Sequence, residues 1–300
     1  MSECLVCDWG TSSFRLMRVG DNGEILTQIS SDHGVKSLKQ PQMEAYLKSQ
    51  MEAIDMASSP ILLCGMVGAG IGWYEAPYVD CPASKASLAR DLVKIPDTDL
   101  NAWCVPGVKR ISNTGAADVM RGEETQVIGW LTQASPVEQA RSTLCLPGTH
   151  SKWVQIEGGE ICSFSTAFTG ELYALLNDYS VLVQGEQEYC AEAFHAGLAA
   201  SAEESGLIHQ LFNTRSRGVL GLQPIAASAA YLSGLLIGSE VAAMARSLET
   251  GSLVHLICGD YLAKPYGQAL EYFGLAFKHY SGSTYSALGL WAISGECNLL

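Results

Sequence analysis

An acidic residue and several hydroxyl side chains directly follow the first apolar run of the chain. After "CLVC" (residues 4–7) come Asp8, Gly10, Thr11, Ser12 and Ser13. Glycine, serine and threonine are ordinary turn residues, so a simple turn is one interpretation. The other is a phosphate-binding loop, in which backbone N–H groups and hydroxyls donate to an anion while a carboxylate at the strand tip holds a metal ion. This stretch alone leaves both interpretations open.

A second copy of the pattern favours the phosphate loop. The segment "TLCLPGTHSKWVQIEGGEIC" carries Gly148, Thr149 and Ser151, 138 residues after Gly10, Thr11 and Ser13. In each copy a second apolar run follows, then a glycine turn typical of hairpins and a further strand. The repeat predicts two antiparallel meanders in two similar domains. We expect their polar loops to bind one anion from opposite sides.

The two copies differ in one functional group. Asp8 stands at the strand tip of the first copy, where the second has Leu146. Because Mg²⁺ prefers carboxylate, water and phosphate oxygens, we expect Asp8 to hold this ion. The second copy adds His150 and Lys152, and Lys152 is either an exposed side chain or a point charge for a phosphate.

The composition indicates the class of protein that positions these residues. The chain has 300 residues, of which 48% are hydrophobic and 16% charged, as is typical of one large or two modest globular domains. A net charge of −13 argues against a nucleic-acid partner.

The ten cysteines lie mostly in apolar runs, and no signal segment is apparent, so we expect reduced thiols and a cytoplasmic protein. Cys4 and Cys7 form a CxxC pair, but on a strand they point to opposite faces.

One stretch, residues 225–245, is long and apolar enough to cross a membrane and contains a GxxxG motif. It also carries Glu240 and lacks flanking basic clusters. We therefore predict a buried helix of a globular domain and no membrane partner.

Six stretches resemble one known family. They are "DWGTSSFR", "GMVGAGIGWYEAPYV", "DVMRGEETQ", "LPGTHSKWV", "FTGELYALL" and "YLSGLLIGSE". The chain resembles the sugar kinase, heat-shock chaperone and actin superfamily, and within it the 2-dehydro-3-deoxygalactonokinase family. The resemblance implies an α/β fold with two ribonuclease-H-like domains that form an ATP-binding clamshell. We expect these domains at residues 1–130 and 131–300, with the last helix returning to the first.

The resemblance also implies a reaction. The expected enzyme transfers the γ-phosphate of ATP, with Mg²⁺, to O6 of 2-dehydro-3-deoxy-D-galactonate. The alternatives are a phosphatase or a non-catalytic ATP-binding regulator on the same fold. A homodimer is compatible with the sequence.

Further site residues follow from the resemblance. The block at residues 65–79 is implied to form the sugar-acid pocket, with Trp73, Tyr74 and Glu75 as wall and hydroxyl partners; a flexible connection is the alternative. Gly259 and Asp260 are implied to approach the adenosine, unless they form a plain strand–helix turn. In the block at residues 65–79, the GxG spacing lacks the register of a dinucleotide fingerprint.

Acidic and basic candidates lie near these motifs. Related kinases carry a general base about 25 residues before the second phosphate loop, where this chain has Glu123, with Asp118 in reserve. Both Glu123 and Glu124 could instead be acids that suit the first turn of a helix. Arg15 and Arg121 are candidates for binding the carboxylate of the acceptor, or for structural ion pairs.

Overall fold

The computed structural model describes residues 3–112, 114–297 and 299. The chain forms two compact units, the first comprising Met1–Leu144, Val154–Ser165 and Tyr280–Leu300, and the second Cys145–Trp153 and Thr166–His279. The boundary expected at residue 130 stays a prediction.

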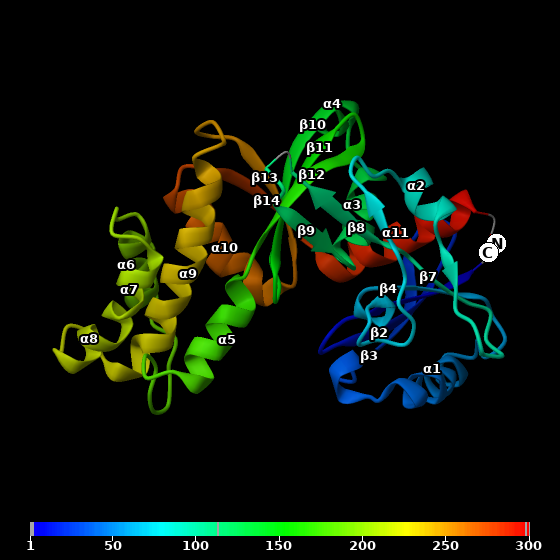
Figure 1. Cartoon of the computed structure of the whole chain (residues 1–300), viewed down its shortest axis with the longest axis horizontal. Coiled ribbons are helices and arrows are strands. Elements are labelled where there is room, and N and C mark those ends of the chain that lie inside the picture. The colour runs from blue at the N-terminus through cyan, green and yellow to red at the C-terminus, as the bar shows by residue number, and fades with distance from the viewer. Residues whose placement is uncertain (1–2, 113, 298, 300) are drawn as a thin grey trace. The chain divides into compact units, whose positions relative to one another are not determined.

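The first unit is built on a six-stranded sheet in the order β3-β2-β1-β4-β7-β6 (Figure 1). Strands β1, β2 and β3 pair antiparallel, β4 runs parallel to both β1 and β7, and β6 pairs antiparallel with β7. The strands are β1 (Cys4–Trp9), β2 (Phe14–Val19), β3 (Ile25–Ser31), β4 (Ile61–Cys64), β6 (Val93–Lys94) and β7 (Ala102–Cys104). The first antiparallel meander predicted from the repeat is therefore confirmed.

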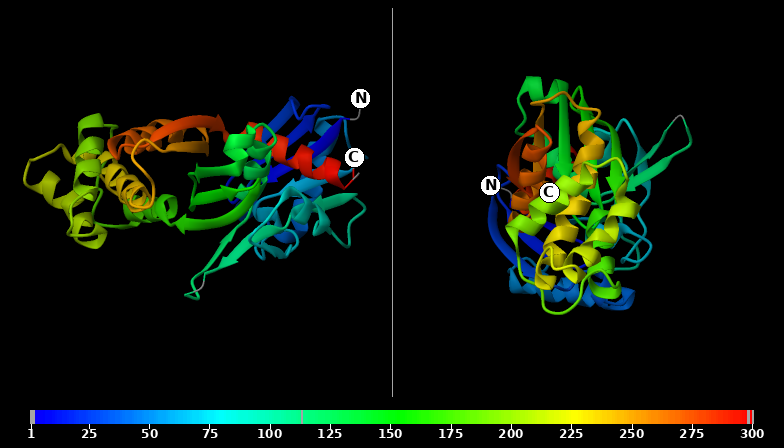
Figure 2. Two further views of the ribbon diagram at one scale, coloured as in Figure 1. Left: turned by 90° about the horizontal axis from the view of Figure 1, so that it is seen from above. Right: turned by 90° about the vertical axis from the view of Figure 1, so that its left-hand side faces the viewer.

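A smaller sheet in the order β5-β8-β9 and several helices complete this unit. Its strands are β5 (Tyr78–Asp80), β8 (Gly107–Ile111) and β9 (Ala117–Met120). The helices are η1 (Val35–Ser37), α1 (Gln40–Ala53), η2 (Met66–Gly68), α2 (Lys85–Arg90), α3 (Glu123–Leu131), α4 (Pro136–Ala140) and α11 (Gly282–Glu296). Helix α11 packs on α3 and on strands β1 and β4. In the left view of Figure 2 this helix, drawn in red, runs beside the blue N-terminal strands.

A five-stranded sheet has the order β12-β11-β10-β13-β14. Its strands are β10 (Arg141–Leu146), β11 (Ser151–Glu157), β12 (Glu160–Ala167), β13 (Leu253–Cys258) and β14 (Ala276–Ser281). Between β11 and β12, Gly158 and Gly159 have φ values of 61° and 79°, which suit the tight hairpin turn expected at this position. Three consecutive strands thus lie side by side again, and the fold is the predicted mixed α/β type.

The second unit contains α5 (Thr169–Tyr179), α6 (Ala191–Ser201), α7 (Leu207–Leu211), α8 (Asn213–Val219), η3 (Ile225–Ala227), α9 (Ser228–Ala245) and α10 (Asp260–Tyr272). Within the described ranges, residues 225–245 form the one helical segment that is apolar and long enough to cross a membrane. However, 72% of its most apolar 18-residue stretch is buried inside the protein. A Cβ on Gly234 would lie 2.0 Å from the Phe194 carbonyl oxygen of α6. This glycine lets α6 and α9 approach backbone to backbone, so the expected buried helix is confirmed.

All ten cysteines are free thiols, and six are buried. Burial raises the pKa of the Cys7 and Cys64 thiols well above their usual value. These thiols are therefore protonated and unreactive at neutral pH.

Candidate active site

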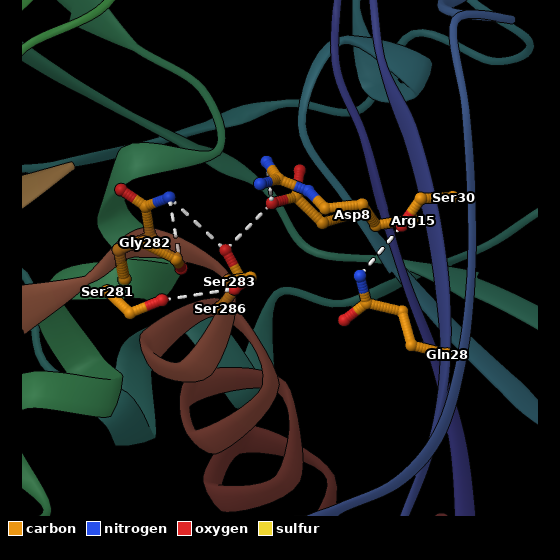
Figure 3. Close-up of polar contacts among 9 residues, drawn as sticks. Asp8, Arg15, Gln28, Ser30, Ser281, Gly282, Ser283 and Ser286 are labelled. Atoms are coloured by element: carbon orange, nitrogen blue, oxygen red, sulfur yellow. Dashed lines mark hydrogen bonds and ion pairs between the residues drawn. The ribbon is translucent and has the colours of Figure 1, made fainter. Parts of the chain in front are cut away.

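Asp8 lies at the end of the central strand β1 and is almost fully buried, with 6% of the residue exposed. The antiparallel register places Arg15 of β2 directly opposite. The Arg15 Nη2 atom donates to Asp8 Oδ2 at 2.9 Å, and Ser286 Oγ of α11 donates to the same oxygen at 2.7 Å (Figure 3). Arg15 therefore makes the ion pair that was one of its two expected roles, and its binding of the acceptor stays a prediction.

The first polar loop is a tight hairpin connection that is hydrogen-bonded to a neighbouring segment. The Gly10 amide donates to the Ser13 carbonyl, and the amide of Val35 donates to the carbonyl of Gly10. A Cβ on Gly34 would lie 2.4 Å from the Ser12 amide nitrogen, so only glycine lets the two segments approach this closely. Ser12 is exposed and the other three loop residues are partly exposed, which leaves hydroxyls of this loop open to a ligand.

Backbone hydrogen bonds join residues within the glycine-rich block after β4. Val67 accepts hydrogen bonds from the amides of Trp73 and Tyr74, and Gly68 accepts one from Ala76. Trp73 is buried in the core of the first unit, whereas Tyr74 and Glu75 are exposed. Of the three predicted pocket residues, Tyr74 and Glu75 are thus the ones a solvent-borne ligand can reach.

Arg121 joins this block to the start of α3. Its Nη2 atom donates to the Ala76 carbonyl oxygen at 2.7 Å, and its guanidinium lies 4.3 Å above the centre of the Tyr78 ring. Only 8% of the residue is exposed, and its Nε and Nη1 atoms have no hydrogen-bond partner within the described chain. Because buried N–H groups without a partner carry a large desolvation penalty, they suit an anionic ligand.

The acids at the start of α3 differ in their surroundings. Glu123 is partly exposed, and its carboxylate accepts from the Arg121 amide at 3.1 Å. Glu124 is fully buried and accepts from the Gly122 amide at 2.7 Å. Burial, followed by the charge of Glu123, raises the pKa of the Glu124 carboxyl to about 8. The predicted helix with both acids in its first turn is confirmed.

Asp118, the second candidate base, lies on strand β9 and is partly exposed. Its carboxylate accepts from the Val119 amide at 2.8 Å. Which of the Asp118 and Glu123 carboxylates is the base stays a prediction.

The residues at the start of helix α5 contact the second polar loop. His150 Nε2 lies 2.6 Å from a Glu171 carboxylate oxygen, and its ring stacks on Phe168 with centroids 5.2 Å apart. The Glu171 amide donates to the Thr149 carbonyl, and a Cβ on Gly170 would lie 2.2 Å from the Gly148 carbonyl oxygen. The loop conformation therefore depends on the segment "FTGE", which the sequence pattern did not connect to it.

Two side chains that follow this loop point inward. Lys152 is buried, and its Nζ donates to Thr166 Oγ1 at 2.9 Å, so it is not the exposed side chain that was one of its two expected roles. Ser151 is fully buried, with its hydroxyl 2.7 Å from that of Tyr266. Binding of a phosphate by either residue stays a prediction.

A buried carboxylate that sequence reasoning missed anchors this region. Glu240 of α9 accepts hydrogen bonds from Trp153 Nε1 and Tyr266 OH, both at 2.8 Å, and from the Thr169 hydroxyl. Burial raises the pKa of the Glu240 carboxyl, and the hydrogen bonds lower it. The only signal in the sequence was an acid within an otherwise apolar helix.

Gly259 and Asp260 form the turn between β13 and α10, as expected for a strand–turn–helix segment. Both residues are exposed. Their contact with a nucleotide stays a prediction.

The surroundings of Asp8 fit a hard cation. Among the described residues, both donors to Asp8 bind Oδ2, so Oδ1 keeps its acceptor capacity. Gly65 has φ +90°, and a Cβ there would lie 3.5 Å from Oδ1 and 2.8 Å from the Trp9 carbonyl oxygen. Glycine thus keeps this side of the carboxylate clear. Over the same residues, no group of three or more His, Cys, Asp or Glu side chains could hold a metal ion. One carboxylate with waters and phosphate oxygens is a normal Mg²⁺ site.

A solved structure of low sequence identity shares the fold. The chain has a mixed α/β fold that divides into two compact units. It superposes on the activator of 2-hydroxyisocaproyl-CoA dehydratase from Clostridium difficile, solved with bound ADPNP, with a TM-score of 0.56 at 11% identity over 99% of this chain and 96% of the other. At this identity the likeness shows the fold alone.

Closer relatives define the family. The family model of 2-keto-3-deoxy-galactonokinase matches residues 8–293, and the chain belongs to this family. It is 35% identical to the 2-dehydro-3-deoxygalactonokinase of Escherichia coli (strain K12) over 97% of both chains. A Sinorhizobium meliloti crystal structure assigned to the same kinase superposes with a TM-score of 0.87 at 32% identity, covering 97% of this chain and 98% of the other.

Proposed function

We propose that this protein is an ATP-dependent kinase that phosphorylates O6 of 2-dehydro-3-deoxy-D-galactonate. The observation that carries the proposal is the family match over residues 8–293, which favours neither a phosphatase nor a non-catalytic regulator. The geometry agrees, because Asp8 lies near the end of β1 beside an open hydroxyl loop. Arg121 presents N–H groups that have no partner among the described residues, beside the glycine-rich block.

Phosphoryl transfer depends mainly on positioning and on charge stabilisation. The loop at residues 10–13 is proposed to donate to phosphate oxygens, and the loop at residues 148–152 to do the same. When bound, Mg²⁺ would neutralise charge on the phosphates, and Asp8 Oδ1 would hold it. Arg121 would bind the carboxylate of the acceptor through two parallel N–H bonds. Glu123 would accept the proton of the attacking hydroxyl.

A coupled assay that follows ADP formation tests this function. Purified protein is given ATP, Mg²⁺ and, in turn, 2-dehydro-3-deoxy-D-galactonate, its C4 epimer and a C6 acid without the 2-keto group. We expect ADP to form with the first acid at a kcat/KM at least about tenfold above that for either other acid. Phosphate release at the same rate without any acceptor would instead identify a phosphatase, and nucleotide binding without turnover would identify a regulator.

A further inference from the structure

The hydroxyl of Ser286 lies between Asp8 and a side chain of another helix. Ser286 Oγ donates to Asp8 Oδ2 at 2.7 Å (Figure 3), and Gln126 Nε2 of α3 donates to Ser286 Oγ at 3.2 Å. Gln126 Nε2 also lies 3.4 Å from the Gly282 carbonyl oxygen. Three elements that are distant in sequence, β1, α3 and α11, therefore meet in one hydrogen-bonded chain.

The groups that form this series of hydrogen bonds determine which of them donate and which accept. The Gly282 carbonyl can only accept, so the Gln126 amide must turn its NH₂ group toward Gly282 and Ser286. Because that NH₂ group only donates, Ser286 Oγ must accept from it. The single hydroxyl proton of Ser286 is then left for Asp8. Gln126 thus makes Ser286 a committed donor to the carboxylate.

Two glycines make the arrangement possible. A Cβ on Gly289 would lie 1.9 Å from the Thr125 carbonyl oxygen, and a Cβ on Gly129 would lie 2.0 Å from the Tyr285 carbonyl oxygen. Helices α3 and α11 therefore touch backbone to backbone. Gln126 and Ser286 each lie three residues before one of these glycines, and hence on the same helix face as that glycine. Close helix packing brings the amide and the hydroxyl into reach.

We propose that Ser286, directed by Gln126, is a positioning residue that fixes the Asp8 carboxylate with Oδ1 left for the Mg²⁺ of the nucleotide. Arg15 supplies the second bond to Oδ2, at 2.9 Å. With two donors on one oxygen, rotation of the carboxylate breaks both bonds, so the free oxygen stays on the side that Gly65 keeps clear. The inference rests on the proposed kinase function and adds a residue from the last helix to it.

The test compares Ser286→Ala with Ser294→Ala. Both serines are buried on α11, but Ser294 Oγ donates to the Trp291 carbonyl of its own helix. Two quantities are measured: kcat, and the ratio of ADP affinities with and without Mg²⁺ by calorimetry. We expect Ser286→Ala to lower kcat about tenfold or more, because a hydrogen bond to a charged group is lost. It should shrink the Mg²⁺ effect on ADP affinity by a similar factor and leave ADP affinity without Mg²⁺ unchanged. Ser294→Ala should match the wild type.

A double-mutant cycle separates positioning from general packing. Gln126→Met should lower kcat less than Ser286→Ala does, and the double variant should be no worse than Ser286→Ala alone, because Gln126 acts only through Ser286. Multiplying effects would overturn the proposal. An unchanged Mg²⁺ effect in Ser286→Ala, or no Mg²⁺ effect in the wild type, would also overturn it. Absence of turnover in the wild type would contradict the kinase function instead, and the ADP titrations would still test Ser286.

Discussion

At the scale of single residues, neighbouring carboxylates have different environments. Glu123 is partly exposed, whereas Glu124 is 0% exposed and bonded to the Gly122 amide. A general base must come within hydrogen-bond reach of the proton that it removes. The structure therefore favours Glu123 over Glu124 for this role, and makes Glu124 a control that lies one residue away.

Replacement of Glu123 by glutamine tests the base. Glu123→Gln should lower kcat by about 10²–10⁴-fold, because size is kept while basicity is lost, and should leave ATP affinity nearly unchanged. Steady-state kinetics provides kcat, and nucleotide titration provides the affinity. Glu124→Gln should change kcat far less. If Asp118→Asn gives a larger loss than Glu123→Gln, Asp118 is the base.

The role of Arg121 depends on two nitrogen atoms of its guanidinium that have no hydrogen-bond partner in the described part of the chain. Arg121→Lys should raise the acceptor KM about tenfold or more and the ATP KM much less, because lysine cannot make the bidentate contact. The control is Arg110→Lys, since Arg110 Nη1 already donates to the Phe164 carbonyl at 2.7 Å. Equal changes in both KM values for Arg121→Lys would show a structural role.

At the scale of elements, the close contact of α3 and α11 controls the position of Asp8's neighbours. The strand–loop–strand repeat could be predicted, because apolar alternation and hairpin glycines are local signals. The contact could not, since Gly129 and Gly289 look like ordinary small residues until their partners are known. The same applies to Ser286 and Glu240, whose hydrogen bonds join residues 278 and 87 positions apart.

Substitution of Gly289 tests this contact. Gly289→Ala should lower the free energy of unfolding by about 3 kcal/mol, since its Cβ would overlap the Thr125 carbonyl. Gly295→Ala on the same helix is the control. The added Cβ meets no atom of the described residues within 4 Å, and the change should stabilise the protein by up to about 1 kcal/mol through helix propensity. Urea unfolding measures both, and equal stabilities for the two variants would contradict the close helix contact.

At the scale of the whole molecule, stability should depend on the protonation of Glu124. Burial raises the pKa of the Glu124 carboxyl from its ordinary value of 4.5 to about 8 in the folded protein, so the folded state retains a proton that the unfolded state loses. This contribution to stability is complete below about pH 4.5 and is lost as the pH rises toward 8. The loss amounts to at most about 5 kcal/mol.

Urea unfolding of the wild type and Glu124→Gln between pH 5 and 8 measures this effect. The difference between the two unfolding free energies should shift in favour of the variant as the pH rises, because glutamine does not titrate. A difference that stays constant over this range would show that Glu124 has an ordinary pKa. The comparison cancels other titrating groups, Glu240 among them.

The most direct test of the central claim is identification of the product by phosphorus NMR. After incubation of the protein with ATP, Mg²⁺ and 2-dehydro-3-deoxy-D-galactonate, we predict a new phosphomonoester signal split into a triplet by the two protons on C6. It should appear in an amount equal to the ADP formed. A signal of inorganic phosphate alone, or an unchanged ATP spectrum, would contradict the proposed kinase function.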